Sequence, residues 1–85
     1  MKKTIIGNVV RETERAVLVS TLVSWGNGSA IRKEIWMPKS VALVIKTIGD
    51  KQHIRLEYWF VRNVEEKNSF HGYPMEFVNC YTEEQ

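Results

Sequence analysis

Aromatic and basic side chains are interleaved in the middle of this chain, and both types are used by proteins that bind single-stranded nucleic acid. In such proteins aromatic faces stack on bases while cations follow the phosphates. The candidate binding residues are Arg32, Lys33, Trp36, Lys39, Arg55, Tyr58, Trp59 and Arg62. An exposed Trp36 with charged neighbours would equally suit the centre of a protein-binding surface. The residue types therefore leave DNA, RNA and protein open as partners.

The two tryptophans in this set have different expected surroundings. Large aromatic residues in a small domain are most often part of the core, and we expect Trp59 to be buried. Trp36 shares one side of its strand with Arg32 and Glu34, so a core position and a surface position are both open for it.

Residues with catalytic potential are few. His53 or His71 with an acid, or Cys80 with His71, could form a dyad, but Gly-x-Ser-x-Gly, phosphate-binding glycine loops and paired histidines do not occur. A lone cysteine in an apolar run is typical of a small buried residue. One cysteine permits no internal disulfide, and the histidines do not have zinc-site spacing. We expect a protein that is not an enzyme and has no metal or cofactor.

The net charge of +2 is unevenly distributed. Residues 1–62 contain eleven Lys and Arg against five acids, whereas residues 63–85 contain one lysine against five glutamates. This asymmetry is compatible with a basic, polyanion-binding body and an acidic tail. It is also common on ordinary solvated surfaces, and no block of five like charges occurs.

Short β-branched and alternating runs predict a mainly β chain with one helix. A bend or bulge is expected at Gly7, and Asn27-Gly28 predicts a hairpin turn. Lys33 interrupts the apolar side of its strand, which indicates a sheet edge or a snorkelling stem. The segment after Gln52 fits a strand or a helix, and we divide it near Leu56. The expected elements are strands at about 4–10, 16–25, 30–37, 41–45 and 52–56, a helix at about 57–67 and a closing strand at about 75–81.

About five short strands and one short helix in 85 residues predict a single domain over 1–85, built as a small SH3-like or OB-like barrel. Closing the barrel would cover strand edges that a chain of this size cannot otherwise protect. The N-terminus lacks the apolar core of a signal peptide, and no run reaches membrane-spanning length. We expect a cytoplasmic protein that does not contact a membrane. The glycosylation sequon at Asn27 is interpreted as a turn.

Four short motifs follow one another along the chain, namely Glu14 to Val19, Lys33 to Ser40 with Trp36-Met37-Pro38-Lys39-Ser40 at its centre, Gly49-Asp50, and Tyr58 to Val61. This succession resembles small uncharacterised domains encoded by bacteriophages and other mobile elements. The resemblance covers residues 12–67, and the chain departs from it around Asn27 and from Phe70 to Tyr81. It implies a mobile-element setting and a strand followed by a tryptophan-bearing helix.

These observations favour a non-catalytic nucleic-acid-binding module from a mobile element. The alternative is a small protein-binding module, such as an inhibitor of a host defence protein. A purely structural or oligomer-forming protein is a third possibility. The sequence does not specify the oligomeric state.

Overall fold

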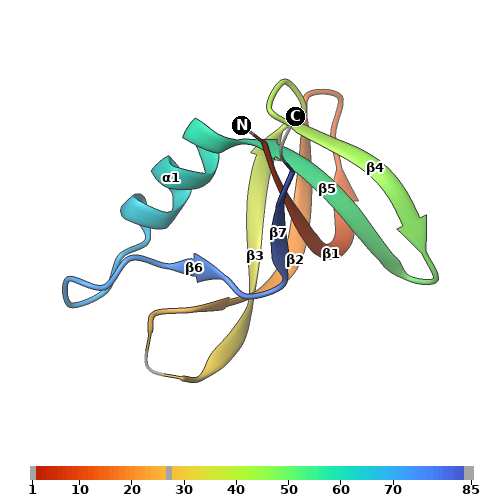
Figure 1. Cartoon of the computed structure of the whole chain (residues 1–85). Helices are drawn as coiled ribbons and strands as arrows, with labels where there is room; N and C mark the ends of the chain where they lie inside the picture. The colour runs from red at the N-terminus through yellow and green to blue at the C-terminus, as the bar shows by residue number, and fades with distance from the viewer. Residues whose placement is uncertain (1, 27, 84–85) are drawn as a thin grey trace.

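The computed structural model describes residues 2–26 and 28–83, and in these residues the chain forms seven strands and one helix (Figure 1). The elements in chain order are β1 (Lys2–Glu12), β2 (Ala16–Ser24), β3 (Ala30–Pro38), β4 (Ala42–Ile48), β5 (Lys51–Glu57), α1 (Tyr58–Lys67), β6 (Glu76–Phe77) and β7 (Cys80–Glu83). The mainly β class expected from the sequence is confirmed. Asn27, and with it part of the expected hairpin turn and the sequon, lies outside the described residues.

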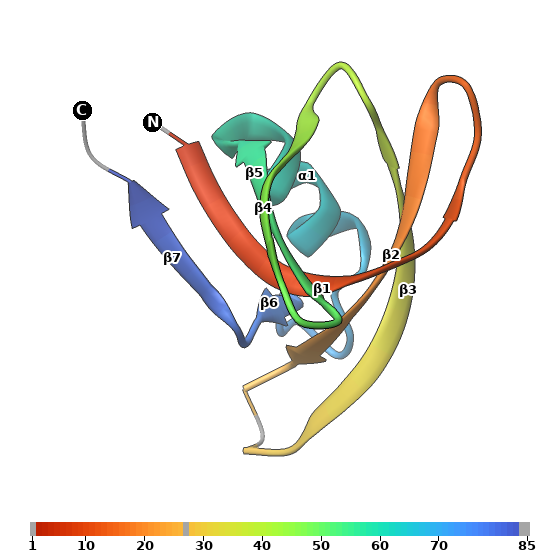
Figure 2. The same ribbon diagram turned by 90° about the vertical axis from the view of Figure 1, so that its right-hand side faces the viewer.

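Strand β1 is shared by the two halves of the sheet, whose order is β3-β2-β1-β5-β4. Residues 2–7 of β1 pair with β5, and residues 8–12 pair with β2. The short strand β7 pairs with the beginning of β1, and β6 pairs with the end of β2. β1 curves across the molecule as it passes from one half to the other (Figure 2). A bend or bulge is expected at Gly7, whereas the irregularity in the pairing of β1 with β2 lies between Val9 and Arg11, about three residues further on.

Gly7 has a different role, because it lies where the backbone of β2 passes close to β1. A Cβ atom at Gly7 would lie 2.7 Å from the carbonyl oxygen of Ser20 and 3.1 Å from side-chain atoms of Val19 and Thr21. Beside it, the Thr21 hydroxyl donates a hydrogen bond of 3.0 Å to the carbonyl oxygen of Ile6. Thr21 is itself buried. The absence of a side chain at Gly7 therefore lets the two halves of the sheet meet.

The core forms from the inward side chains of the strands together with one face of α1. Strand β5 shows the alternation of a strand with one buried face, since the buried residues Ile54 and Leu56 alternate with residues that face away from the core. α1 begins at Tyr58, one residue after the expected start, and its Val61 and Val64 complete the core. Asn68 ends the helix, and its backbone and side-chain N–H groups both donate to the Val64 carbonyl oxygen. The buried core residues are Ile5, Val17, Val19, Val23, Ile35, Met37, Ala42, Ile54, Leu56, Val61, Val64, Met75 and Phe77.

The sheet is open between β3 and β4. These strands are consecutive and are joined by the short turn at residues 39–41, but they diverge from it, and no described pairing links them (Figure 2). The barrel expected from the sequence is therefore not closed. The expected closing strand at 75–81 is also divided, because residues 78 and 79 form a bend between β6 and β7. Across that bend Val78 N–H donates to the Leu22 carbonyl, and Ile6 N–H donates to the Asn79 carbonyl.

Candidate nucleic-acid interface

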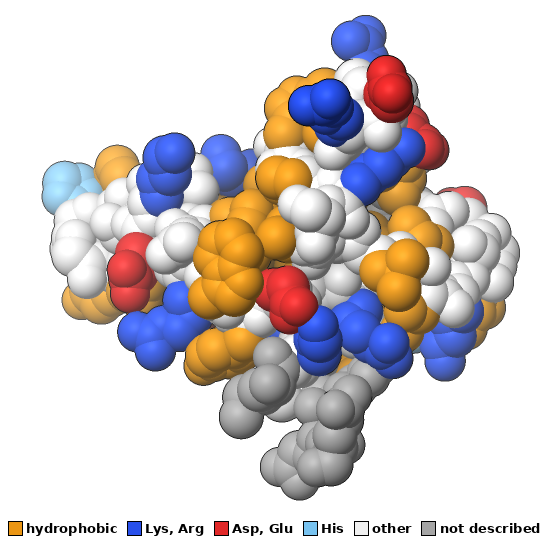
Figure 3. Space-filling model, turned by 90° about the horizontal axis from the view of Figure 1, so that it is seen from above, with side chains coloured by type: hydrophobic (Ala, Val, Ile, Leu, Met, Phe, Trp, Pro, Cys, Tyr) orange, Lys and Arg blue, Asp and Glu red, His pale blue; other side chains and the backbone are white. Residues whose placement is uncertain are grey.

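The residues expected to bind are distributed over several surfaces rather than gathered in one. Arg32 and Trp36 alternate with buried Ile35 and Met37 and therefore project outward from β3. Arg55 projects outward from β5, at the other side of the central strand β1. Tyr58, Trp59 and Arg62 lie on α1, whose Val61 and Val64 contact the inward side of the sheet. Exposed hydrophobic side chains lie beside Lys and Arg side chains over the surface seen from above (Figure 3).

On β3, Arg32 is held by the neighbouring strands. Its Nη1 donates to Ser20 Oγ at 3.2 Å and to Asn8 Oδ1 at 3.5 Å, and the Asn8 amide donates to the Asp50 carbonyl oxygen. This chain of contacts connects β3 to the turn between β4 and β5. Trp36 is 46% exposed and lies opposite Leu18 in the register. Of the two positions left open by the sequence, Trp36 takes the surface one.

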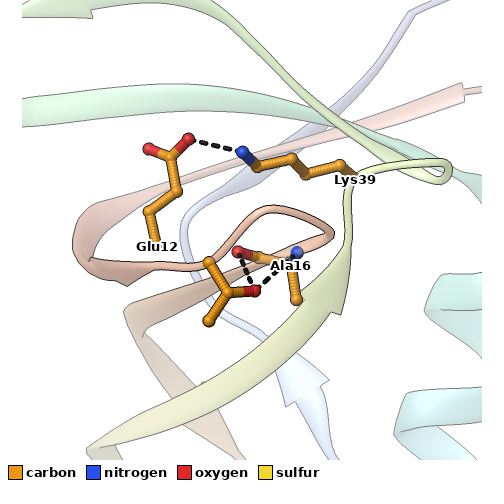
Figure 4. Close-up of polar contacts among 4 residues, drawn as sticks. Glu12, Ala16 and Lys39 are labelled. Carbon is orange, nitrogen blue, oxygen red and sulfur yellow. Dashed lines mark hydrogen bonds and ion pairs between the residues drawn. The ribbon is translucent and has the colours of Figure 1, made fainter.

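Lys33 lies in an edge strand of the sheet, and Lys39 lies in the turn that follows this strand. Lys33 lies on the inward side of β3, a strand that pairs with β2 alone among the described elements. That position agrees with the sheet-edge interpretation. Lys39 follows β3, where its Nζ is 2.5 Å from Glu12 Oε2 (Figure 4). Its backbone N–H donates to the Arg15 carbonyl. In the turn between β1 and β2, the Ala16 N–H donates to the Thr13 hydroxyl at 3.1 Å. Lys39 therefore connects the β3–β4 turn to the β1–β2 turn.

The expectation that Trp59 is buried is wrong, because its side chain is 58% exposed. The face of α1 that contacts the core contains Val61 and Val64, and Trp59 lies outside it, edge-on to Phe60 with ring centroids 6.1 Å apart. Arg62 is also exposed and pairs with Glu66 one turn further along the helix at 3.3 Å. Aromatic and basic character on α1 is thus directed away from the sheet.

A more coherent basic surface lies on the side of the β1–β5–β4–β7 half that faces away from the core, here called the outer face. The register places Thr4 between Arg55 and Tyr81, and His53 between Ile6 and Lys46. Lys51 lies on the same side of β5, two residues before His53. The outer face thus gathers Lys46, Lys51, His53, Arg55 and Tyr81. Sequence reasoning identified only Arg55 of these five.

Two rings meet on the outer face. His53 Nδ1 is 3.1 Å from the Tyr81 hydroxyl, and the ring centroids are 5.9 Å apart with an interplanar angle of 58°. Tyr81 is 37% exposed, so part of its ring remains open to solvent. Of the side chains described on this face, Glu57 is the acidic one, and its carboxylate pairs with Lys2. The outer face therefore combines open aromatic surface with an excess of positive charge.

A second aromatic group joins the β2–β3 hairpin to the segment after α1. The Trp25 indole N–H donates to the Asn68 carbonyl oxygen at 2.7 Å, and an apolar depression is lined by Trp25, Ser29, Ile31 and Phe70. A neighbouring depression adds His71 and Tyr73. No lysine or arginine is among the described residues that line either depression. This group therefore lacks the cations that a phosphate backbone requires.

The residues considered for catalysis have other contacts. The Cys80 thiol donates to the Phe77 carbonyl oxygen at 3.3 Å, and the His71 ring lies edge-on to Phe70. Within residues 2–26 and 28–83, no group of three or more His, Cys, Asp or Glu side chains could hold a metal ion. The helical part of these residues falls short of the length and apolarity needed for a membrane span.

Comparisons of this chain with protein-family models, curated proteins and solved structures give no match. Assignment of function therefore depends on the residues and their geometry.

Proposed function

We propose that this chain is a non-catalytic module that binds single-stranded nucleic acid, DNA or RNA, on the outer face. The observation that carries the proposal is the convergence of Lys46, Lys51 and Arg55 with the His53–Tyr81 ring pair. Cations neutralise phosphates and release counterions, whereas rings stack on bases of any sequence. A mobile-element setting and a cytoplasmic location would both suit this role.

Single-stranded nucleic acid suits this face better than a duplex. Stacking requires bases that are not already paired and stacked, and Tyr81 offers a ring that is partly open to solvent. The cations come from two neighbouring strands, since Lys46 lies opposite His53 and Arg55 follows His53 by two positions. Neighbouring strands are about 4.8 Å apart and alternate residues on one strand about 6.6 Å apart. Charges at these separations can contact successive phosphates of a flexible strand.

Fluorescence anisotropy of labelled single-stranded and duplex oligonucleotides, at about 50 mM and 200 mM salt, tests the proposal. We expect the single strand to bind more tightly and its affinity to fall as salt rises. Lys46→Glu with Lys51→Glu should weaken binding by about tenfold or more and flatten the salt dependence, because two phosphate contacts are lost. Both lysines are exposed, so these changes should leave the fold intact.

The matched control is Arg15→Glu with Lys67→Glu, which makes the same change in net charge at exposed positions away from the outer face. Equal losses in the two double variants would mean that net charge, and not this face, determines binding. Failure of the unaltered protein to bind at low salt would reject the nucleic-acid function altogether. The second candidate, protein binding, is favoured by a different feature, the free edge of β4.

A further inference from the structure

Strand β4 has an edge that no other strand covers. Among the described elements it pairs with β5 alone. Val44 and Ile54 are paired in that ladder and both face inward, yet Ile54 is fully buried whereas Val44 is 41% exposed. The difference arises because Ile54 lies between two neighbouring strands, β1 and β4, whereas Val44 has a neighbouring strand, β5, on one side only. The core is thus incomplete along β4.

Another uncovered edge, on β3, is protected in the way that natural sheets protect their edges. Arg32, Lys33 and Glu34 place three consecutive charges along β3, and Pro38 closes it. Such residues discourage pairing with another chain. β4 has weaker protection, namely Lys46 and a bulge between Val44 and Lys46, and it exposes Leu43 and Ile48 by about three-fifths of their surface. An exposed apolar edge of this kind is a template for an additional strand.

Two depressions adjoin the first half of β4, and both include Lys39, Ala42 and Leu43. One occupies about 490 Å³ and is lined further by the inward residues Val9, Val17 and Val44, with Gln52 and Glu12 beside them. The other occupies about 330 Å³ and is lined further by Lys2, Ser40, Val41, Arg55, Leu56 and Glu57. The first is an apolar recess on the core side, and the second has cations at its rim.

We infer that β4 binds an extended segment of a partner protein as an additional strand, with apolar side chains entering the core-side recess and acidic side chains alternating with them. The alternation follows from strand geometry, in which successive side chains point to opposite faces. Main-chain hydrogen bonds to β4 would supply affinity, and the two depressions would supply specificity.

Charge indicates the kind of partner. The described acids that line the two depressions are Glu12 and Glu57, and each already pairs with a lysine. The cations that line the depressions or lie on β4 itself outnumber these acids, and they are Lys2, Lys39, Lys46 and Arg55. A second copy of the chain would bring the same excess of positive charge to the same edge, which disfavours self-association. An acidic, apolar-alternating segment from another protein complements it.

Selection from a random peptide library, with peptides at least as long as the seven residues of β4, provides the probe. We expect enriched peptides to alternate apolar and acidic residues. Their affinity should fall by about tenfold or more on Val44→Lys and remain unchanged on Ile31→Lys, a similarly exposed apolar position on the protected edge strand β3. No enrichment, or equal binding to both variants, would overturn the inference.

A second measurement does not depend on how the variants fold. N-methylation removes backbone donors, so methylating alternate residues of a selected peptide should abolish binding when the methylated edge faces β4 and spare it when the other edge is methylated. Equal effects of the two patterns would exclude strand addition. Concentration-dependent dimers that disappear in Val44→Lys would assign this edge to a second copy and likewise contradict the inference. Loss of oligonucleotide binding in Lys46→Glu with Lys51→Glu tests the proposed nucleic-acid function separately.

Discussion

Gly7 and Ser20 lie so close together that a Cβ atom on Gly7 would be 2.7 Å from the Ser20 carbonyl oxygen. That oxygen belongs to the backbone of β2, which Thr21 ties to β1 through its bond to the Ile6 carbonyl. The contact therefore cannot be relieved by rotating a side chain. It marks the point at which β1 leaves β5 and joins β2.

We predict that Gly7→Ala destabilises the fold by about 2–3 kcal/mol, the upper range for overpacking a rigid site. Chemical denaturation would measure the change in the free energy of unfolding. Gly49→Ala is the control, since that glycine has a φ of 63° but no heavy atom beyond its two chain neighbours lies within 4 Å of the place that an added methyl group would occupy. Its cost should be only that of the left-handed backbone, about 1 kcal/mol. If Gly7→Ala costs no more than Gly49→Ala, β1 and β2 are not rigidly held there.

Two tryptophan substitutions should have different effects on stability. Trp25 is partly buried and its indole N–H donates to the Asn68 carbonyl at 2.7 Å, which ties the β2–β3 hairpin to the end of α1. Trp25→Phe removes this bond and should cost about 1 kcal/mol or more. Trp59→Phe changes an exposed ring and should alter stability by less than about 0.5 kcal/mol. Urea denaturation of the two variants provides the comparison, and a larger cost at Trp59 would contradict the exposed position.

The strands and the helix could be predicted because their signals are local. Alternation of apolar and polar residues at 30–37 and 52–56 indicates strands. Residues 57–67, which contain no Gly or Pro and end before Asn68, indicate a helix. The fate of Trp59 could not be predicted in this way. Leu56, Trp59, Phe60 and Val64 would share one face only if the helix included Leu56, whereas α1 begins at Tyr58 and turns Val61 inward instead.

The outer face could be predicted only in part, because it depends on register between distant segments. Alternation along β5 already places His53 and Arg55 on one side, but Lys46 joins them through a bulge in β4. Tyr81 joins through β7, a four-residue strand whose partner is the beginning of the chain. The sequence pattern indicates neither this bulge in β4 nor the pairing of β7 with the distant strand β1.

Glu65 should make stability depend on pH. Burial raises the pKa of its carboxyl above the usual value of 4.5, and Glu76 acts in the same direction. The Lys3 ammonium, 3.8 Å away, Arg62 and the Phe77 backbone oppose the rise but do not cancel it. Because the folded pKa is raised, the folded state binds the proton more readily than the unfolded state. The stabilising contribution is thus complete below pH 4.5 and is lost as the pH rises through the folded pKa.

Glu65→Gln should therefore increase the free energy of unfolding near neutral pH and have little effect below the usual carboxyl pKa, where Glu65 is already neutral. Urea denaturation over a pH series would measure both. Glu66→Gln is a suitable control on the same helix, since Glu66 is exposed and pairs with exposed Arg62. A destabilised Glu65→Gln variant at neutral pH would show that the Lys3 pair outweighs the cost of burial.

Two substitutions of Tyr81 can distinguish base stacking from hydrogen bonding in the proposed nucleic-acid interface. Its hydroxyl meets His53 Nδ1 at 3.1 Å, whereas its ring is partly open to solvent. Tyr81→Phe keeps the ring and should retain most of the affinity for a single-stranded oligonucleotide. Tyr81→Ala removes the ring and should cost about 1–3 kcal/mol if one base stacks there. Anisotropy titrations of both variants at one salt concentration measure the difference. Equal losses would assign the role of Tyr81 to its bond with His53, and no loss in either would place base stacking elsewhere on the protein.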